Sequence, residues 1–345
     1  MNAIKTRQDS DKTVIYNKLK KEVLFLGDDT SLEKPVFAIW EITSKCNLNC
    51  VHCSSSDLEG EMTKEECFKV IDKLDDSGIF WVQLSGGEPL LRNDIFEILS
   101  YLRKKGIDTE IYTNGTLITK EIAKKLKILD VDNINISLDG LKQSHERIRG
   151  RETYEKTVEG IKNCLDENLD AVLTITLMKS CIGDLEKLLE FAIQKGMDKV
   201  KIIDLMPVGK GDALYKKEML NKNEMKNVVK ILKKYSDRLL IIPEVPIFEF
   251  EHICDAARTF FRITPDGNIT PCSFFKKEFS GGNILEQSVE SIWKSNIFKR
   301  IRDIKISDRC VGCDIFDKCR GGCIIRAYNE YGRFDKTDPR CWKNE

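Results

Sequence analysis

The chain contains 345 residues, of which 41% are hydrophobic and 32% charged, as in a folded protein with a sizeable core. Its 56 basic and 56 acidic residues give a formal net charge of zero, which argues against a nucleic-acid partner because a nucleic-acid-binding surface needs an excess of basic residues. No apolar run approaches the roughly 20 residues of a membrane span, and residues 1–21 are polar, without the apolar core of a secretory signal. We therefore expect no membrane partner and a cytoplasmic location.

Cysteine is abundant and histidine is scarce. The chain has 13 cysteines but only 3 histidines. In an intracellular chain, so many cysteines indicate metal ligands rather than disulfides. Because histidines are so few, a metal ion or cluster must be bound mainly by thiolates.

Between residues 36 and 205, six short apolar runs alternate with segments of helical periodicity. Strands that alternate with helices form βα units, so this pattern predicts a parallel sheet, either open or partly closed into a barrel. One helix is predicted to begin after Thr63, where Glu66 completes a capping box. The expected strands are 36–42, 80–84, 107–112, 133–138, 171–177 and 200–205, and further expected helices are 94–104, 120–129, 152–165 and 184–195.

After residue 205 the pattern changes. A further helix is predicted over 221–235, with Asn221 as its cap and Glu224 three residues on. From residue 247 onward cysteines are dense and turns are frequent. Pro265-Asp266-Gly267, between two β-type segments, indicates a hairpin turn. We expect three parts: an N-terminal extension (1–35), a barrel region of the α/β class (36–240) and a small cysteine-rich α+β domain (241–345).

A cysteine triplet, Cys46-x3-Cys50-x2-Cys53, directly follows the first predicted strand. Three thiolates on one loop can hold three irons of a [4Fe–4S] cluster and leave the fourth iron open to the amino and carboxylate groups of S-adenosylmethionine (SAM). One electron from such a cluster splits the SAM sulfonium and yields a 5′-deoxyadenosyl radical. The alternative is a structural zinc site, which this spacing fits poorly because zinc usually takes four ligands in pairs. His52 is predicted to contact the adenine side of SAM.

Polar motifs follow the next three predicted strands, at the end of a βα fold where active sites gather. A Gly-Gly-Glu-Pro motif begins at Gly86. Its glycines, Gly86 and Gly87, allow close backbone approach, and Glu88 can accept a hydrogen bond from the SAM ammonium group. Asn114 follows the third strand and Ser137 ends the fourth. We predict that all five residues lie at the SAM site, whereas the residue that acts on the substrate stays unassigned.

With these motifs, residues 36–205 resemble the radical SAM superfamily. The resemblance implies a partial (βα)6 TIM-like barrel. It also implies that Gly86, Gly87 and Glu88 lie near the methionine moiety of SAM and that Ser137 lies near its polar end.

Seven further cysteines follow residue 250. Zinc knuckles are one interpretation, since thiolate-only sites suit both zinc and iron–sulfur clusters. The spacing, including Gly267 ahead of Cys272, resembles the SPASM domain of enzymes that mature peptides and proteins. That resemblance implies two auxiliary [4Fe–4S] clusters, hence three in the chain, the first auxiliary cluster having either an open iron or an eighth ligand from elsewhere. The implied ligands are Cys254, Cys272 and Cys323 for one auxiliary cluster, and Cys310, Cys313, Cys319 and Cys341 for the other.

The resemblance also bears on the reaction. Segments around Trp40 and Cys50 are similar to those of mycofactocin-peptide maturases, whereas Ser273 stands where sulfatase-maturing enzymes carry an aspartate. We therefore expect SAM cleavage coupled to crosslinking, decarboxylation or desaturation of a ribosomal peptide or protein side chain. A radical SAM enzyme that modifies a tetrapyrrole, and an iron–sulfur electron carrier, are the alternatives.

Partners follow from this expectation. The substrate would be a precursor peptide. Residues 1–35 are too few for a winged-helix-like recognition module, so a separate peptide-binding chaperone is expected to deliver it. A reductant such as flavodoxin or ferredoxin would supply the electron.

Overall fold

A ten-stranded sheet organises the molecule. The computed structural model describes residues 4–10, 12–18, 22–26, 32–244, 250, 254–305, 307–341 and 343. In this part of the chain the strands of the sheet lie in the order β10-β9-β8-β7-β6-β5-β4-β11-β12-β13. The run from β4 to β10 is parallel throughout, which confirms the predicted parallel sheet and adds one strand to it. These strands are β4 (Phe37–Thr43), β5 (Trp81–Gly86), β6 (Asp108–Thr113), β7 (Asn133–Ser137), β8 (Ala171–Leu177), β9 (Lys199–Asp204) and β10 (Leu240–Pro243).

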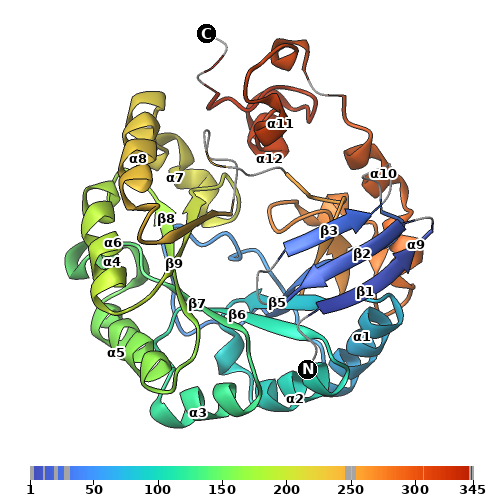
Figure 1. The fold of residues 1–345 in the computed structure, drawn as a ribbon, viewed down its shortest axis with the longest axis horizontal. Helices are drawn as coiled ribbons and strands as arrows, with labels where there is room; N and C mark the ends of the chain where they lie inside the picture. Colours follow the sequence, from blue (N-terminus) through green and yellow to red (C-terminus); the bar gives the residue numbers. More distant parts are fainter. Residues whose placement is uncertain are drawn as a thin grey trace.

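Helices between these strands cover the outer face of the sheet and form an arc around it in Figure 1. Both predicted helix starts are confirmed: Thr63 accepts a hydrogen bond from Glu66 N–H, and Asn221 accepts one from Glu224 N–H, each within a capping box. The helices are α1 (Lys64–Asp76), α2 (Ile95–Lys104), α3 (Lys120–Ile128), α4 (Lys142–Arg149), α5 (Thr153–Asp166), α6 (Leu185–Gln194), α7 (Lys210–Glu218) and α8 (Lys222–Tyr235).

The barrel strands have one apolar and one polar face, because successive side chains of a strand point to opposite sides. On β4, Trp40 and Ile42 belong to the main hydrophobic core. Residues of the other face include Glu41 on β4, Glu110 on β6 and Lys201 on β9, all buried. Lys201 contacts Glu110 although β7 and β8 separate their strands. The sheet must therefore curve so that the polar face lines its concave side, which we call the lumen.

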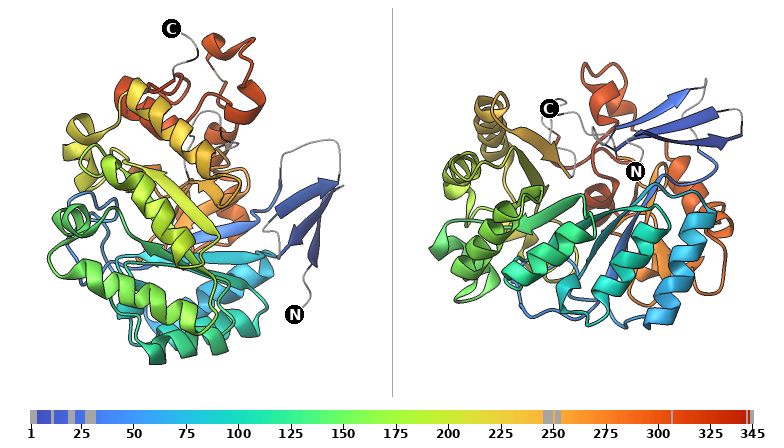
Figure 2. Two further views of the ribbon diagram at one scale, coloured as in Figure 1. Left: turned by 60° about the vertical axis from the view of Figure 1, so that its left-hand side comes forward. Right: turned by 60° about the horizontal axis from the view of Figure 1, so that its bottom comes forward.

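A second sheet, three-stranded and antiparallel, occupies the N-terminal extension and was not predicted. Tyr16 stacks on Trp81 at the start of β5, with ring centroids 4.8 Å apart. Lys5 pairs with Asp108 at the start of β6, at 2.9 Å. The small sheet therefore lies at the amino ends of the barrel strands, and Figure 2 shows it projecting to one side. Its strands are β1 (Ile4–Asp9), β2 (Lys12–Asn17) and β3 (Glu22–Leu26).

The C-terminal part continues the large sheet. β11 (Phe260–Ile263) pairs in parallel with β4 and turns through the predicted hairpin into β12 (Asn268–Thr270). The expected boundary after residue 240 falls inside β10. The C-terminal helices lie where the arc of barrel helices opens (Figure 1), and no helix among the described residues is long and apolar enough to span a membrane. The remaining elements are β13 (Gly282–Asn283), α9 (Val289–Trp293), α10 (Asn296–Arg302), α11 (Phe316–Cys319) and α12 (Ile324–Tyr331).

Candidate active site

The cysteine triplet lies on the loop between β4 and α1, at the carboxyl end of the barrel strands. Cys46 is exposed, Cys50 is buried and Cys53 is half-buried, and none of them forms a disulfide. Burial raises the pKa of Cys46 and of Cys50, and the charges of neighbouring thiolates of the triplet raise both further. A backbone hydrogen bond of 3.0 Å from Val51 N–H to Ile148 O fastens the loop to α4. The structure thus brings the three thiols together at the barrel mouth.

The Gly-Gly-Glu-Pro motif packs directly on this loop. A Cβ atom added to Gly87 would lie 2.0 Å from the carbonyl oxygen of Lys45, and one added to Gly86 would lie 2.4 Å from that of Thr43. Gly87 N–H donates to Thr43 O at 2.7 Å, and Glu88 N–H donates to Lys45 O at 2.8 Å. The glycines therefore permit a backbone approach to the cysteine loop that any side chain would block.

Glu88 links the ends of β5 and β6. Its fully buried carboxylate accepts hydrogen bonds from Leu90 N–H (3.1 Å), Thr113 Oγ1 (2.8 Å) and Asn114 N–H (2.8 Å). Burial raises the pKa of Glu88, while these bonds stabilise its ionised form. A carboxylate has about four acceptor positions, so the three bonds leave room for one further donor. The side chain of Asn114 donates to Asn47 Oδ1 in the cysteine loop at 2.9 Å.

A buried ionic network lies behind the cysteine triplet. Asp139 accepts hydrogen bonds from Arg149 Nε at 2.6 Å and Thr176 N–H at 2.9 Å, and His52 Nε2 lies 3.4 Å from its carboxylate. Burial disfavours the ionised form of Asp139, but Arg149, His52 and His145 together outweigh this effect and lower its pKa. Arg149 also places Nη1 4.0 Å from Cys50 Sγ. No role was predicted for Arg149, since its contacts arise only when α4 folds against the barrel.

The remaining predicted SAM residues border this network. Burial lowers the pKa of His52 to about 4, so its ring is neutral near pH 7. The ring faces Asp139, and its contact with adenine stays a prediction. Ser137 is half-buried at the end of β7, two residues before Asp139.

Three C-terminal cysteines lie close together beside the barrel. Burial raises the pKa of Cys254 to about 12, and the charge of Cys323 adds to this. Burial likewise raises the pKa of Cys272, with contributions from the charges of Cys254 and Cys323. Because these thiols influence one another electrostatically, they form one group.

The other four cysteines form a second group. Burial raises the pKa of Cys310, and the charges of Cys341 and Cys313 raise it further. Burial raises the pKa of Cys319 to about 11, with contributions from Cys341 and Cys310. The two groups have the membership that the SPASM resemblance implies, and the binding of clusters by them stays a prediction.

Arg326 joins the C-terminal part to the barrel. Its side chain is 1% exposed. Nη1 lies 2.8 Å from Asp204 at the end of β9, and Nη2 lies 2.6 Å from Asp338. Asp338 also accepts a hydrogen bond of 2.8 Å from Cys323 N–H. This chain of contacts fixes the first cysteine group relative to β9.

The donor chemistry of the cysteine groups fits iron–sulfur clusters, which are held by thiolates. Among the residues that the structure describes, no three His, Cys, Asp or Glu side chains converge on a single metal-ion position. A structural zinc ion requires such convergence, with Zn–S distances of about 2.3 Å. In a cluster each thiolate binds its own iron, so the sulfurs lie farther apart. The choice between clusters and structural zinc therefore rests on the spacing of the cysteines, which resembles that of the SPASM domain.

The three cysteines outside these groups are buried. Cys67, Cys164 and Cys181 are 0–4% exposed, and burial raises the pKa of each to about 12. Cys181 lies near the hydrogen-bond acceptor Thr176 O, at 3.5 Å. Thiols in such surroundings are protonated and unreactive near neutral pH.

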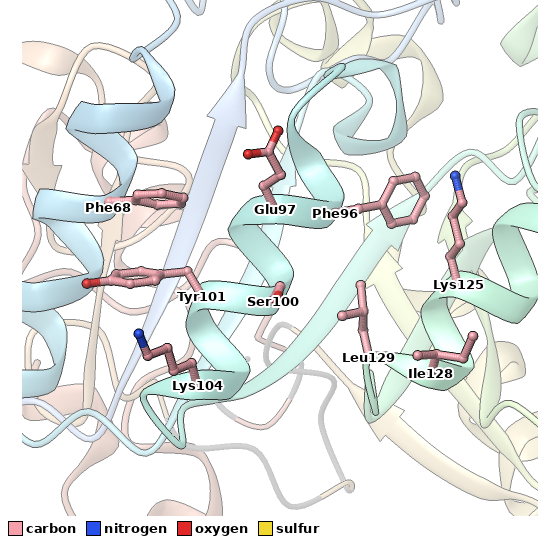
Figure 3. A pocket seen from close by; sticks show the side chains of 9 residues that line it. All are labelled: Phe68, Phe96, Glu97, Ser100, Tyr101, Lys104, Lys125, Ile128 and Leu129. Carbon is pink, nitrogen blue, oxygen red and sulfur yellow. The ribbon is translucent and has the colours of Figure 1, made fainter.

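A surface hollow of about 560 Å³ lies away from this site, on the outer layer formed by α1, α2 and α3 (Figure 3). Phe68 stacks on Tyr101 at 4.4 Å, and Lys125 lies 4.9 Å from the Phe96 ring. None of the cysteines and none of the predicted SAM residues lines it. The lining residues are Phe68, Phe96, Glu97, Ser100, Tyr101, Lys104, Lys125, Ile128 and Leu129.

Two family models match the chain in the order that the fold requires. The radical SAM superfamily matches residues 40–192, and the SPASM iron–sulfur cluster-binding domain matches residues 254–314. The first match begins in β4 and ends in α6. The second covers four of the seven C-terminal cysteines.

Characterised relatives match along most of their length. Mycofactocin maturase MftC of Mycolicibacterium smegmatis is 28% identical over 330 residues, which cover 91% of this chain and 84% of the relative. AdoMet-dependent heme synthase of Methanosarcina barkeri is 30% identical over 338 residues, which cover 89% of this chain and 96% of the relative.

Solved structures share the fold. Streptococcus suis SuiB bound to S-adenosylmethionine superposes with a TM-score of 0.83 at 17% identity, covering 99% of each chain. SuiB bound to its precursor peptide SuiA gives a TM-score of 0.81 at 16% identity, covering 99% of this chain and 98% of that one. These likenesses confirm the partial barrel with its C-terminal SPASM domain. On the family matches and the relatives together, the chain belongs to the radical SAM superfamily and is an enzyme of its SPASM-containing members.

Proposed function

We propose that this enzyme reductively cleaves SAM and oxidatively modifies a ribosomally made peptide. The observation that supports the proposal is that two C-terminal cysteine groups lie beside a barrel whose mouth holds a third cysteine group, the triplet. When bound, [4Fe–4S] clusters supply the electron that splits SAM into methionine and a 5′-deoxyadenosyl radical and provide acceptors for electrons from the substrate. With four irons in each cluster, we infer about 12 irons per chain.

The chain's own residues prepare the SAM site. Gly86 and Gly87 let the backbone of β5 hold the cysteine loop in place. Glu88 keeps one acceptor position for the SAM ammonium group. Asp139 fixes the Arg149 guanidinium near Cys50, where a positive charge stabilises thiolate ligands.

A peptide is favoured over a tetrapyrrole as the substrate. Two similar proteins support a peptide substrate, since MftC is named as a maturase and SuiB was solved with a precursor peptide. The heme synthase, at 30% identity, supports a tetrapyrrole. A tetrapyrrole with carboxylate side chains needs cationic partners. Three buried cations in and around the lumen are instead paired with carboxylates of the chain: Arg149 with Asp139, Arg262 with Glu41, and Lys201 with Glu110.

Two protein partners belong to this proposal. The strands β1, β2 and β3 form a small sheet in the extension, and a separate peptide-binding chaperone is proposed to present the precursor. A flavodoxin or ferredoxin is proposed to reduce the cluster at the barrel mouth.

The test is turnover by anaerobically reconstituted enzyme. The enzyme is incubated with SAM, a reductant and synthetic peptides encoded beside its gene, and mass spectrometry follows the peptides and 5′-deoxyadenosine. We expect a peptide to lose two hydrogens or a carboxyl group while 5′-deoxyadenosine forms. The C46A/C50A/C53A variant is the control, and it should form no 5′-deoxyadenosine.

The same assay separates the rival substrate. Turnover of an iron-containing tetrapyrrole, with every neighbouring peptide unchanged, would refute the peptide proposal. An iron content of about four per chain, with zinc in the remaining sites, would refute the auxiliary clusters while leaving SAM cleavage in place.

A further inference from the structure

The lumen holds an ionic network that the SAM site does not use. Lys201 Nζ lies 3.3 Å from Glu110 Oε2, 3.2 Å from Glu244 Oε1 and 2.5 Å from the hydroxyl of Tyr112. The Tyr112 hydroxyl donates to Glu244 Oε1 at 3.2 Å. Glu110 and Tyr112 belong to β6, Lys201 belongs to β9, and Glu244 directly follows β10. The network therefore joins three separate strands across the concave side of the sheet.

Buried acceptors without a partner surround this network. Among the described residues, Asn133 Oδ1, Asn135 Oδ1 and Thr174 Oγ1 are buried and form no hydrogen bond. The amide groups of both asparagines point to Glu110, with Nδ2 at 2.8 Å for Asn133 and 3.5 Å for Asn135. Buried polar atoms are normally satisfied. These atoms are therefore suited to a ligand that brings hydrogen-bond donors, such as the N–H groups of a peptide.

The network lies next to the predicted SAM contacts. In the sheet register Thr174 on β8 stands beside both Ser137 on β7 and Lys201 on β9. Neighbouring strands are about 4.8 Å apart, so about 10 Å separates the backbones of Ser137 and Lys201. Tyr112, on β6, stands two residues before Asn114 in the chain. A substrate in the lumen can thus reach both the SAM site and the network.

Lys201 and Tyr112 already carry their protons, so among these groups only the carboxylates of the network can accept another proton. Burial disfavours the ammonium form of Lys201, but Glu110 and Glu244 outweigh it and raise its pKa. Burial, together with the charge of Glu244, raises the pKa of Tyr112. Both groups therefore keep their protons near pH 7. Glu110 is 5% exposed and bound on several sides, whereas the Glu244 side chain is 25% exposed.

We propose that Glu244 accepts the proton that the substrate loses when its radical is oxidised, and that Lys201 and Tyr112 position the Glu244 carboxylate. This inference rests on the proposed function. After a hydrogen atom has left the substrate, the substrate radical gives one electron to an oxidised iron–sulfur acceptor and one proton to Glu244. An N–H, O–H or C–H bond of the substrate breaks, and an O–H bond forms on the carboxylate. The two electrons that remain form the new double bond or crosslink.

The experiment compares E244Q with the wild-type holoenzyme. Both are incubated with SAM, dithionite and the synthetic precursor peptide, and the ratio of modified peptide to 5′-deoxyadenosine is measured. We expect E244Q to form 5′-deoxyadenosine within twofold of wild type but to lower the ratio about 100-fold, a typical loss for a general base. E186Q, at the α6 surface pair of Glu186 with Lys234, is the matched control and should keep the wild-type ratio. A purely structural role for Glu244 would lower both products together.

Each of the other outcomes also supports or overturns the proposed role of Glu244. A wild-type ratio in E244Q would overturn the role of Glu244 while leaving the proposed function intact. If E244Q forms no 5′-deoxyadenosine, E244A is assayed with added formate, because the partly exposed site admits a small carboxylate. Product that rises with formate supports the proposal, and product that does not rise overturns it. A wild-type enzyme that forms 5′-deoxyadenosine but modifies no peptide refutes the proposed function and this inference with it.

Discussion

Removal of the Asp139 charge tests the buried network behind the cysteine triplet. The change Asp139→Asn keeps the shape of the side chain, but it leaves the Arg149 guanidinium without its carboxylate partner at 2.6 Å. Asp139 is fully buried, and the Arg149 side chain is 11% exposed. Breaking a buried ion pair on one side costs about 3–5 kcal/mol, because an uncompensated charge stays in the interior. We expect a loss of this size in the free energy of unfolding at pH 7.

Urea denaturation of the iron-free protein measures this loss. Tryptophan fluorescence reports on the barrel, since Trp40 and Trp81 are buried in β4 and β5. With a denaturant slope of about 3 kcal/mol/M, the midpoint should fall by about 1–2 M. The control is Glu155→Gln, which breaks an ion pair with Lys142 whose side chains are 57% and 61% exposed. Such an exposed pair contributes about 0–1 kcal/mol.

The double variant Asp139→Asn/Arg149→Met makes the test sharper. Replacing both buried charges removes the uncompensated guanidinium, so the double variant should be more stable than Asp139→Asn alone. Equal midpoints for Asp139→Asn and Glu155→Gln would refute the reasoning. A double variant that shows the two single losses added together would also refute it, since the residues would then not be coupled.

Three further predictions concern Gly87, His145 and Cys181. Gly87→Ala should displace the cysteine loop, because its Cβ would lie 2.0 Å from Lys45 O. The variant should lose about four irons and should no longer form 5′-deoxyadenosine. Gly183→Ala, whose Cβ meets no atom within 4 Å, is the control that should change neither quantity. Burial lowers the pKa of His145 to about 4, below its usual value of about 6.5, so the native state resists protonation. The contribution of the neutral His145 ring to the free energy of unfolding is complete above pH 6.5 and falls by about 3 kcal/mol as the pH drops to 4. The His145→Gln variant should therefore show a flatter decline of the urea midpoint between pH 7 and 5. A decline as steep as that of the wild type would contradict this. Cys181→Ala should leave iron content and 5′-deoxyadenosine formation unchanged, whereas a loss of either would show that the thiol is not inert.

The sequence predicted the parts of the fold that depend on local pattern. Apolar runs and helical periodicity identified the six strands from β4 to β9, and capping residues identified the starts of α1 and α8. The short helix α4 was not predicted, since only His145 and Ile148 of its eight residues are buried. The N-terminal sheet was also not predicted. Its β2 alternates buried and half-buried residues, but such a short strand is recognisable only once Phe80 and Trp81 provide a surface for Tyr16.

The candidate site likewise has one part that local sequence pattern predicts and another that only the tertiary structure brings together. Cysteine spacing places residues within a loop, so the triplet and its neighbours could be read from the chain. Asp139 and Arg149 stand ten residues apart and meet only because α4 folds back on the end of β7. Lys201 and Glu244 belong to different βα units, and their contact requires the curvature of the whole sheet. Contacts of this kind depend on tertiary structure and leave no local pattern.

The large sheet also fixes the cysteine groups relative to one another. β4 leads into the loop of the triplet, and β11, which pairs with β4, leads through a hairpin to Cys272. On the other side, Asp204 at the end of β9 holds Arg326, three residues after Cys323. The first C-terminal group is therefore attached to the barrel at two strands that are not neighbours in the sheet. Because a twisted sheet of ten strands is stiffer than a linker, the separation between this group and the triplet is set by the barrel. The Asp204–Arg326 contact therefore helps to set the distance over which electrons would pass between sites at these positions.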